Sequence, residues 1–281
     1  MPELPEVESV REGLNQMIVG EKIIQVEVHW DNIIESPAVT DFKKRLEGQI
    51  FETVKRRGKF LLFYLTEDVL ISHLRMEGKY QYSLAGDYRK NSKNKKHRHV
   101  VFHLESGCDL AYFDVRKFGR MSLVKKGEEF EHKSLKKLGP EPVLADFKLA
   151  DMRELLTKRT KAIKGVLLDQ QMVVGIGNIY ADEILFQSKI YPGKPANTLT
   201  ENEEEILYES IIEILAKAVE HGGTTIRTYE NAFGENGKYQ KYLKVYGKED
   251  SACPRCGTKI EKIKVVGRGT HFCPNCQEVN E

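Results

Sequence analysis

The feature that most constrains the fold is a set of four cysteines near the end of the 281-residue chain. They occur as two Cys-x2-Cys pairs, Cys253 with Cys256 and Cys273 with Cys276, separated by 16 residues. This spacing is typical of a site in which four thiolates bind one zinc ion tetrahedrally. Such a zinc is structural, because no coordination position stays open for chemistry. The segment is too short for a core of its own, so we expect its fold to depend on the metal.

The alternative use of these cysteines, as two redox-active pairs, fits the sequence less well. CPRCG and CPNCQ lack a thioredoxin-like strand and helix context and instead supply turn residues that direct both sulfurs of a pair to one ion. The fifth cysteine, Cys108, stands apart. The N-terminal residues are acidic where a signal peptide needs bases, and no apolar run reaches the roughly 18 residues of a membrane helix. We therefore expect a cytosolic protein with reduced cysteines.

Two longer regions precede the cysteine module. From Lys22 to about Val124, short runs rich in β-branched and aromatic residues are separated by Gly, Asp, Ser and Asn, which predicts a β-sandwich. After LGPEPVLADF the apolar spacing becomes helical, and the longest helix begins at a capping box of Thr200 and Glu203 and ends at Gly222 and Gly223. We therefore expect an α+β multidomain protein with domains at residues 1–133, 151–240 and 247–281 and a linker at 134–150.

The distribution of charge favours a polyanionic partner more than the net charge does. The formal net charge is only +2, and 40% apolar with 31% charged residues is ordinary for a folded protein. Basic blocks occur in KRRGK (residues 55–59), YRKNSKNKKHRH (88–99) and TKRTKAIK (157–164). Each block alone is also compatible with a solvated surface.

The N-terminus, MPELPEVESV, contains a candidate nucleophile. Removal of Met1 leaves Pro2 as a free secondary amine, and an α-amino group is far less protonated at neutral pH than a lysine. Such an amine condenses with a sugar aldehyde to an iminium that cannot be neutralised by deprotonation. The carboxylates of Glu3 and Glu6 can exchange protons beside it. The simpler alternative is that these residues only define the start of a helix near Pro5, in which Val7, Val10 and Leu14 recur at helical spacing.

Three strand-like motifs combine polar groups with apolar ones. Lys59 begins an apolar strand and is either a functional amine or an edge lysine that deters aggregation. ISHLRMEG alternates His73 and charged residues with apolar ones, which favours Met76 in the core. DVRKFG is expected to place Arg116 and Phe118 on one face of a strand end. A guanidinium and an aromatic wedge can fill the space of a base that leaves a duplex, although an exposed arginine beside a core phenylalanine is the simpler explanation.

Two glycine-containing turns are candidate phosphate sites. In VVGIGNIYADE, Gly175 and Gly177 open a helix at Asn178, where backbone N–H groups can face a phosphate. This motif is too short for dinucleotide binding, and an ordinary interhelical turn explains it equally well. In VVGRGTHFCPNC, Arg268 lies between two glycines at the tip of the predicted ribbon, where it either reaches a nucleic-acid groove or is simply solvated.

Together these motifs resemble one family. PELPEVE, RRGKF, SHLRMEG, DVRKFG, LGPEP, GIGNIYADE, GGTT and GRGTHFCPNCQ occur in order from Pro2 to Gln277, as in formamidopyrimidine-DNA glycosylases, the bifunctional 8-oxoguanine repair enzymes of bacteria. The resemblance implies an N-terminal catalytic β-sandwich domain, a helix-two-turns-helix DNA-binding domain and a zinc-ribbon finger that holds one structural Zn2+.

The resemblance also implies roles for individual residues. Pro2 would attack C1′ of the damaged nucleotide, Glu3 would transfer protons at the sugar ring and the leaving base, and Lys59 and Arg268 would assist elimination at the two phosphates. The side chains that enter the void of the flipped base would be Met76, Arg116 and Phe118. Further DNA contacts would be His73, His97, Lys161, Asn178, Tyr246 and Lys262. Residues 225–237 resemble the lesion-capping loop of the family.

The implied activity is excision of 8-oxoguanine and formamidopyrimidines from duplex DNA through a Pro2 iminium, followed by strand cleavage by β,δ-elimination. The expected partner is double-stranded DNA with oxidised purines or abasic sites. We expect a monomer in the bacterial cytoplasm, nucleoid-associated when bound to DNA, with no membrane contact. One alternative is an endonuclease VIII-like glycosylase for oxidised pyrimidines, and another is a non-catalytic zinc-finger nucleic-acid-binding protein. The void-filling residues disfavour the first, and an intact Pro2 with Glu3 and Lys59 disfavours the second.

Overall fold

The computed structural model describes residues 1–85, 96–224 and 237–278. These residues form two compact units. Unit 1 contains Met1–Lys137 and Gly222–Lys238, and unit 2 contains Leu138–His221 and Tyr239–Glu281. Each unit has its own hydrophobic core. The boundaries between three domains that the sequence suggests remain predictions.

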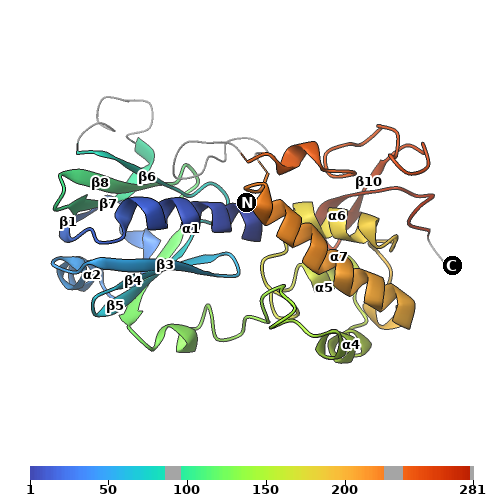
Figure 1. Cartoon of the computed structure of the whole chain (residues 1–281), viewed down its shortest axis with the longest axis horizontal. Coiled ribbons are helices and arrows are strands. Elements are labelled where there is room, and N and C mark those ends of the chain that lie inside the picture. Colours follow the sequence, from blue (N-terminus) through green and yellow to red (C-terminus); the bar gives the residue numbers. More distant parts are fainter. Residues whose placement is uncertain (86–95, 225–236, 279–281) are drawn as a thin grey trace. The chain divides into compact units, whose positions relative to one another are not determined.

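Unit 1 contains two β-sheets with an N-terminal helix packed along them (Figure 1). The four-stranded sheet is antiparallel and has the order β1 (Ile23–Val28), β7 (Arg98–Leu104), β8 (Cys108–Phe113), β6 (Lys79–Leu84). The five-stranded sheet has the order β2 (Ile34–Ser36), β9 (Arg120–Lys125), β5 (Asp68–His73), β4 (Phe60–Leu65), β3 (Phe51–Arg57). Only the β2–β9 pair is parallel among the described strands of this sheet. The prediction of a β-sandwich is therefore confirmed.

Helix α1 (Leu4–Ile18) buries its apolar stripe in the same core as both sheets. Val7, Val10 and Leu14 recur at helical spacing and are at most 2% exposed, so the helix predicted from this spacing is confirmed. A second helix, α2 (Val39–Leu46), lies between β2 and β3 in a region that the sequence suggested to be β-rich. It buries Phe42 and Leu46, which lie one helical turn apart. Two apolar positions are a weak helical pattern, and the strand-like sequences on either side make the helix hard to predict.

Two motifs that the sequence suggested to be strand ends form turns instead. Strand β5 ends at His73 and strand β8 ends at Phe113. Arg75 and Lys117, just beyond these ends, have φ angles of 54° and 59°, in the left-handed region that stops strand alternation. Met76 is consequently 39% exposed, and its assignment to the core is wrong.

Unit 2 combines helices with a C-terminal hairpin. Its helices are α4 (Leu149–Thr157), α5 (Ile163–Leu167), α6 (Asn178–Gln187) and α7 (Glu201–Glu220), and the hairpin consists of β10 (Glu261–Val265) and β11 (Arg268–Phe272). Helix α7 begins at the predicted capping box, because Thr200 Oγ1 accepts the Glu203 N–H at 3.3 Å and Glu203 Oε2 accepts the Thr200 N–H at 2.8 Å. It ends before Gly222 and Gly223, both with positive φ.

Short 3-10 turns complete the described part of both units, at Asp31–Ile33, Glu129–Glu131, Ala196–Thr198 and Tyr239–Lys241. None of the helices in the described ranges combines the length and the apolar composition that a membrane crossing requires.

Candidate functional site

The N-terminal segment is anchored on one buried carboxylate. Glu6 Oε2 accepts the N–H of Glu3 at 2.7 Å, and Glu6 Oε1 accepts both the N–H and the Oγ1 hydroxyl of Thr224, at 2.7 and 3.1 Å. Glu3 and Glu6 are each 2% exposed, and Pro2 is buried as well. Because Glu3 caps a helix of 15 residues, the position of Pro2 is set by a rigid element rather than by a frayed terminus.

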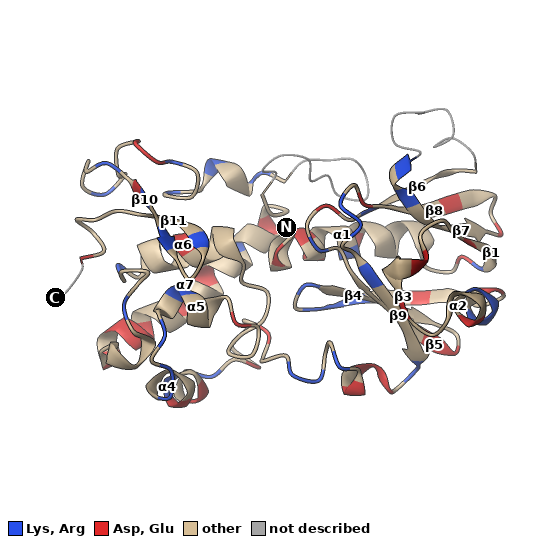
Figure 2. Cartoon of the chain, turned by 180° about the vertical axis from the view of Figure 1, so that it is seen from behind, with Lys and Arg blue, Asp and Glu red and all other residues tan. Residues whose placement is uncertain are grey.

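Lys59 lies in the basic turn between β3 and β4, which Figure 2 shows in blue. Lys59 is only 6% exposed, which excludes the alternative of a solvated lysine at a strand edge. Arg56 holds this turn on α1, since its Nε donates to Glu8 at 2.6 Å and its Nη1 donates to the Gly58 carbonyl at 3.0 Å. A buried amine on a fixed turn is suited to act on a ligand at a defined position.

His73 is a neutral hydrogen-bond donor. Its Nδ1 accepts the N–H of Arg75 at 2.9 Å, and its ring packs edge-on against Phe60 with centroids 4.5 Å apart. Burial, reinforced by the charges of Arg75 and Lys59, lowers the pKa of His73 to about 3. Since Nδ1 is an acceptor, the ring proton lies on Nε2, which is the atom left to donate to a phosphate or base.

The depressed pKa of His73 predicts a specific pH dependence of stability. Below pH 6.5 the unfolded chain takes up a proton at this residue that the folded chain does not bind until about pH 3, so stability is lost as pH falls. His73→Asn keeps an acceptor for the Arg75 N–H and removes the titration. We expect the wild-type free energy of unfolding to fall relative to this variant by about 2 kcal/mol between pH 7 and pH 5. Parallel urea titrations at both pH values measure this, and an unchanged difference would contradict it.

Three exposed side chains extend from the two turns of unit 1 described above. Met76 lies on the turn after β5, and Arg116 and Phe118 lie on the turn after β8 rather than on a strand face as the sequence suggested. Phe118 is 46% exposed, so it is not a core residue. The Arg116 guanidinium carbon lies 4.8 Å from the centroid of the Phe118 ring. The two side chains are thus already stacked on each other as a pair.

In unit 2, Arg268 lies at the tip of the β10–β11 hairpin, as predicted. It pairs with Val265 across a two-residue turn of Val266 and Gly267, whose φ angles are 44° and 76°. Of the other predicted contacts on this unit, Lys262 on β10 forms an ion pair with Glu249 at 2.6 Å. The Tyr246 ring packs on that of His271, with centroids 5.0 Å apart.

A buried ion pair fixes the hairpin to the helices of unit 2. Lys164 on α5 is fully buried and donates to Asp182 Oδ1 at 2.6 Å, to Thr270 Oγ1 at 2.8 Å and to the Gly269 carbonyl at 3.1 Å. Asp182 Oδ2 in turn accepts the backbone N–H of His271 at 2.9 Å. A buried charge pair needs such complete hydrogen bonding to be tolerated, so the network fixes the strand that begins at Arg268.

The sequence did not identify this network, and it assigned a role to a different lysine of the same basic run. Lys161 is exposed and pairs with Asp169 at 3.3 Å, whereas Lys164 is the internal one. The only signal was a lysine within the apolar run AIKGVLL. Asn178, at the start of α6, donates from Nδ2 to the Gly269 carbonyl at 3.0 Å, and its Oδ1 is buried without a hydrogen-bond partner in the described part of the chain.

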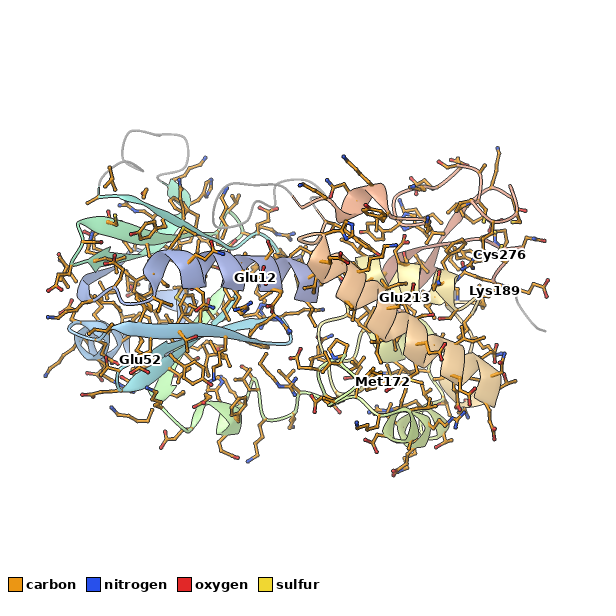
Figure 3. The ribbon with its side chains drawn as sticks, in the orientation of Figure 1. Glu12, Glu52, Met172, Lys189, Glu213 and Cys276 are labelled. Atoms are coloured by element: carbon orange, nitrogen blue, oxygen red, sulfur yellow. The ribbon has the colours of Figure 1, made fainter. Side chains whose placement is uncertain are left out.

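The four cysteines converge on one point. Their Sγ atoms all lie within 4.8 Å of one another, with 3.9 Å between Cys253 and Cys276 and 3.5 Å between Cys256 and Cys273. A tetrahedral zinc with bonds of about 2.3 Å places its sulfurs about 3.8 Å apart, so the cluster fits such an ion. Figure 3 labels Cys276, which follows β11. The cluster therefore supports a structural metal site.

Two remaining parts of the predicted site differ in what the structure describes. His97 is half-buried directly before β7. Residues 225–236 of the predicted lesion-capping loop lie outside the described residues. Thr224, which precedes that loop in the sequence, donates its N–H to the Glu6 carboxylate at 2.7 Å.

Three domain families match the chain in order. They are described as the formamidopyrimidine-DNA glycosylase N-terminal domain (residues 1–121), the formamidopyrimidine-DNA glycosylase H2TH domain (138–230) and a zinc finger found in FPG and IleRS (251–279). The formamidopyrimidine-DNA glycosylase of Enterococcus faecalis is 53% identical over 279 residues, which cover 99% of this chain and 98% of that protein. The enzyme of the same name from Streptococcus pneumoniae is 50% identical and covers 99% of both chains.

Solved structures with the same architecture contain DNA. The Lactococcus lactis Fpg in complex with DNA that contains an abasic site is 45% identical, with a TM-score of 0.91 over 99% of this chain and all of that one. The complex of the same protein with DNA that contains FAPY-dG gives the same identity, coverage and TM-score.

Proposed function

Since the chain belongs to the formamidopyrimidine-DNA glycosylase family and is a DNA glycosylase, we propose that it excises oxidised purines from double-stranded DNA and cleaves the abasic strand that results. The substrates are 8-oxoguanine and formamidopyrimidines, in line with the abasic and FAPY-dG DNA bound by its Lactococcus lactis relative. The observation that carries the proposal is the anchored N-terminus, in which a buried Glu6 holds Glu3 and hence Pro2 in place.

The chemistry begins at the Pro2 nitrogen once Met1 has been removed. Its lone pair forms a bond to C1′ as the glycosidic bond breaks and its electron pair leaves with the base, which takes up a proton. The nitrogen then gives up its proton and the Glu3 carboxyl group donates one to the ring oxygen O4′, so the sugar ring opens to an iminium between the proline and C1′. Loss of a C2′ proton then expels the 3′-phosphate, and a second elimination expels the 5′-phosphate. Lys59 and Arg268 stabilise these leaving phosphates.

The DNA is held by groups on both units. On unit 1, Met76, Arg116 and Phe118 occupy the space of the flipped base. The exposed apolar side chain of Met76 and the aromatic ring of Phe118 are suited to unstacking the neighbouring bases. Donors to the DNA backbone are His73, His97, Lys161, Asn178, Tyr246 and Lys262. In this scheme residues 1–133 form the catalytic domain, and residues 134–150 link it to the rest of the chain. The helix-two-turns-helix domain (151–240) and the zinc ribbon (247–281) bind DNA.

The metal is zinc, bound by the thiolates of Cys253, Cys256, Cys273 and Cys276. When bound, it supplies no chemistry and organises the module behind the hairpin tip. The hairpin then presents Arg268 and Lys262 to the DNA. We place the enzyme, as a monomer, in the bacterial cytoplasm and on the nucleoid when it is bound to DNA.

The proposal is tested with duplex oligonucleotides that carry one 8-oxoguanine, one oxidised pyrimidine or one preformed abasic site. We expect excision at 8-oxoguanine and cleavage products with phosphates at both ends of the gap. Preference for the oxidised pyrimidine would overturn the purine assignment, and binding without any excision would overturn the enzymatic one.

The same substrates separate the two roles of the N-terminus through Glu3→Gln. Release of the base needs a proton donor, whereas a preformed abasic aldehyde needs mainly the amine and assistance to elimination. We therefore expect this variant to lose at least about tenfold more activity on 8-oxoguanine than on the abasic site, in line with the size of general acid catalysis. Equal losses on the two substrates would instead assign Glu3 to holding the N-terminus.

A further inference from the structure

We propose that Asp114 is a positioning residue for the stacked pair Arg116 and Phe118, and that the Tyr112 hydroxyl keeps their turn in register with the turn that carries Met76. The inference rests on the proposed function, in which these three side chains enter the space of the flipped base. Neither Asp114 nor Tyr112 reaches the DNA in this scheme, because both are fully buried.

The carboxylate of Asp114 is the centre around which the turn after β8 is wrapped. Its Oδ1 accepts the N–H of Arg116 at 2.9 Å, and its Oδ2 accepts the N–H groups of Phe118 and Gly119 at 2.9 and 2.7 Å. Three charge-assisted hydrogen bonds thus hold the backbone on both sides of the two exposed side chains. The position of the pair is set from inside the protein rather than by its own contacts.

Asp114 is itself fixed to the neighbouring strand by its backbone. Its N–H donates to the His97 carbonyl at 2.9 Å, and its carbonyl bonds to His99 Nε2 at 2.7 Å. A side chain of the turn also contacts the rest of unit 1, because the ammonium group of Lys117 lies 3.9 Å from the centroid of the Trp30 ring. Lys117 has the left-handed φ of 59°, a conformation that costs energy and persists only where contacts impose it. The carboxylate supplies such contacts on either side of it.

Tyr112 links this turn to the other one. Its hydroxyl is buried and has no hydrogen-bond partner within the described ranges, although buried polar groups are usually paired. A Cβ at Gly78 or at Gly119 would overlap this hydroxyl, so both turns approach it as closely as glycine allows. Gly78 closes the Met76 turn with its N–H on the Leu74 carbonyl at 2.9 Å. The hydroxyl is therefore a spacer between the two turns.

Asp114→Asn tests the inference with little change in volume. An amide presents an oxygen on one side only, so on the other side its NH2 group faces a backbone N–H and at least one hydrogen bond is lost. We expect excision of 8-oxoguanine from duplex DNA to fall by about tenfold, the size of one lost charge-assisted bond. Cleavage at an abasic site in single-stranded DNA should change less than about twofold, since no base stack has to be opened there.

A double-mutant cycle separates positioning from general destabilisation. In the Arg116→Ala, Phe118→Ala background, Asp114→Asn should cause no further loss, because the groups that it positions are gone. The matched control is Asp109→Asn on β8, the strand that leads into the turn, a buried carboxylate that binds His103 at 2.6 Å and should leave the ratio of duplex to single-strand activity unchanged. Tyr112→Phe removes only the spacer, and we expect the same duplex-specific loss at smaller size.

The inference is overturned if Asp114→Asn excises 8-oxoguanine at the wild-type rate, if its loss is equal on single strands, or if the loss is fully additive in the cycle. If Asp114→Asn does not fold, the same criteria apply to Tyr112→Phe. Absence of excision by the wild-type chain would overturn the proposed function and this inference with it, whereas wild-type excision combined with an unaffected Asp114→Asn overturns the inference alone.

Discussion

Extending the chain at its N-terminus is expected to reduce strand cleavage at an abasic site by at least about a thousandfold. An extension converts the Pro2 nitrogen into an amide, whose lone pair is delocalised and cannot attack C1′. The fold should tolerate the change at Met1, which is 46% exposed. Borohydride trapping of the protein on abasic DNA should disappear together with cleavage, because no iminium forms.

The matched control is an extension that ends in a protease site, so that cleavage leaves Pro2 as the first residue. Activity should return to the wild-type level on proteolysis of the same sample, which excludes misfolding as the cause. Pro2→Gly keeps a terminal amine and should retain partial trapping. Cleavage of abasic DNA by the uncut extended protein at the wild-type rate would exclude the N-terminal nucleophile.

Removal of the metal is expected to abolish tight duplex binding. Cys256→Ser removes one of four ligands from a cluster that has little core of its own, so the hairpin should lose its order. Phosphate contacts dominate the affinity of proteins for DNA, and the loss of those from Arg268 and Lys262 should weaken binding by about two orders of magnitude at moderate salt. Unit 1 should stay folded, because its core contains none of these four cysteines.

Cys108→Ser is the matched control for this substitution, since Cys108 lies on β8 in unit 1 and is not a member of the cluster. It should retain both the metal content and the affinity of the wild-type protein. Chelation of the wild-type protein should reproduce the effect of Cys256→Ser, and metal analysis identifies the ion. Undiminished duplex affinity in a Cys256→Ser protein without metal would contradict the structural role of the site.

The sequence predicted those elements that are determined by residues close to one another along the chain. The capping box at Thr200 and the apolar spacing that begins at Val7 each lie within one or two helical turns, so the chain alone defines them. The cysteine cluster was predictable for a similar reason, because a tetrahedral metal site requires two closely spaced pairs of ligands, which are visible in the sequence. Membership of the family followed from several such motifs in order.

Long-range contacts determined what the sequence did not reveal. The turns after β5 and β8 were expected to be strands, since their residues alternate, but Arg75 and Lys117 have left-handed φ angles that end the alternation. Gly78 in the first of these turns approaches the Tyr112 hydroxyl, which comes from the later strand β8. The buried Lys164 is separated by 106 residues from Thr270, to which it donates. Nothing in a basic run indicates which of its lysines has an internal partner, so Lys164 was not identified, and Lys161 was assigned only through the resemblance to the family.

The most direct test of the account is the site of the covalent bond to DNA. The wild-type protein, incubated with 8-oxoguanine duplex and borohydride, is digested and its DNA-linked peptide is sequenced by mass spectrometry. We predict one adduct, on the nitrogen of an N-terminal Pro2 that has lost Met1. An adduct on a lysine such as Lys59, with the N-terminal peptide unmodified, would contradict the account.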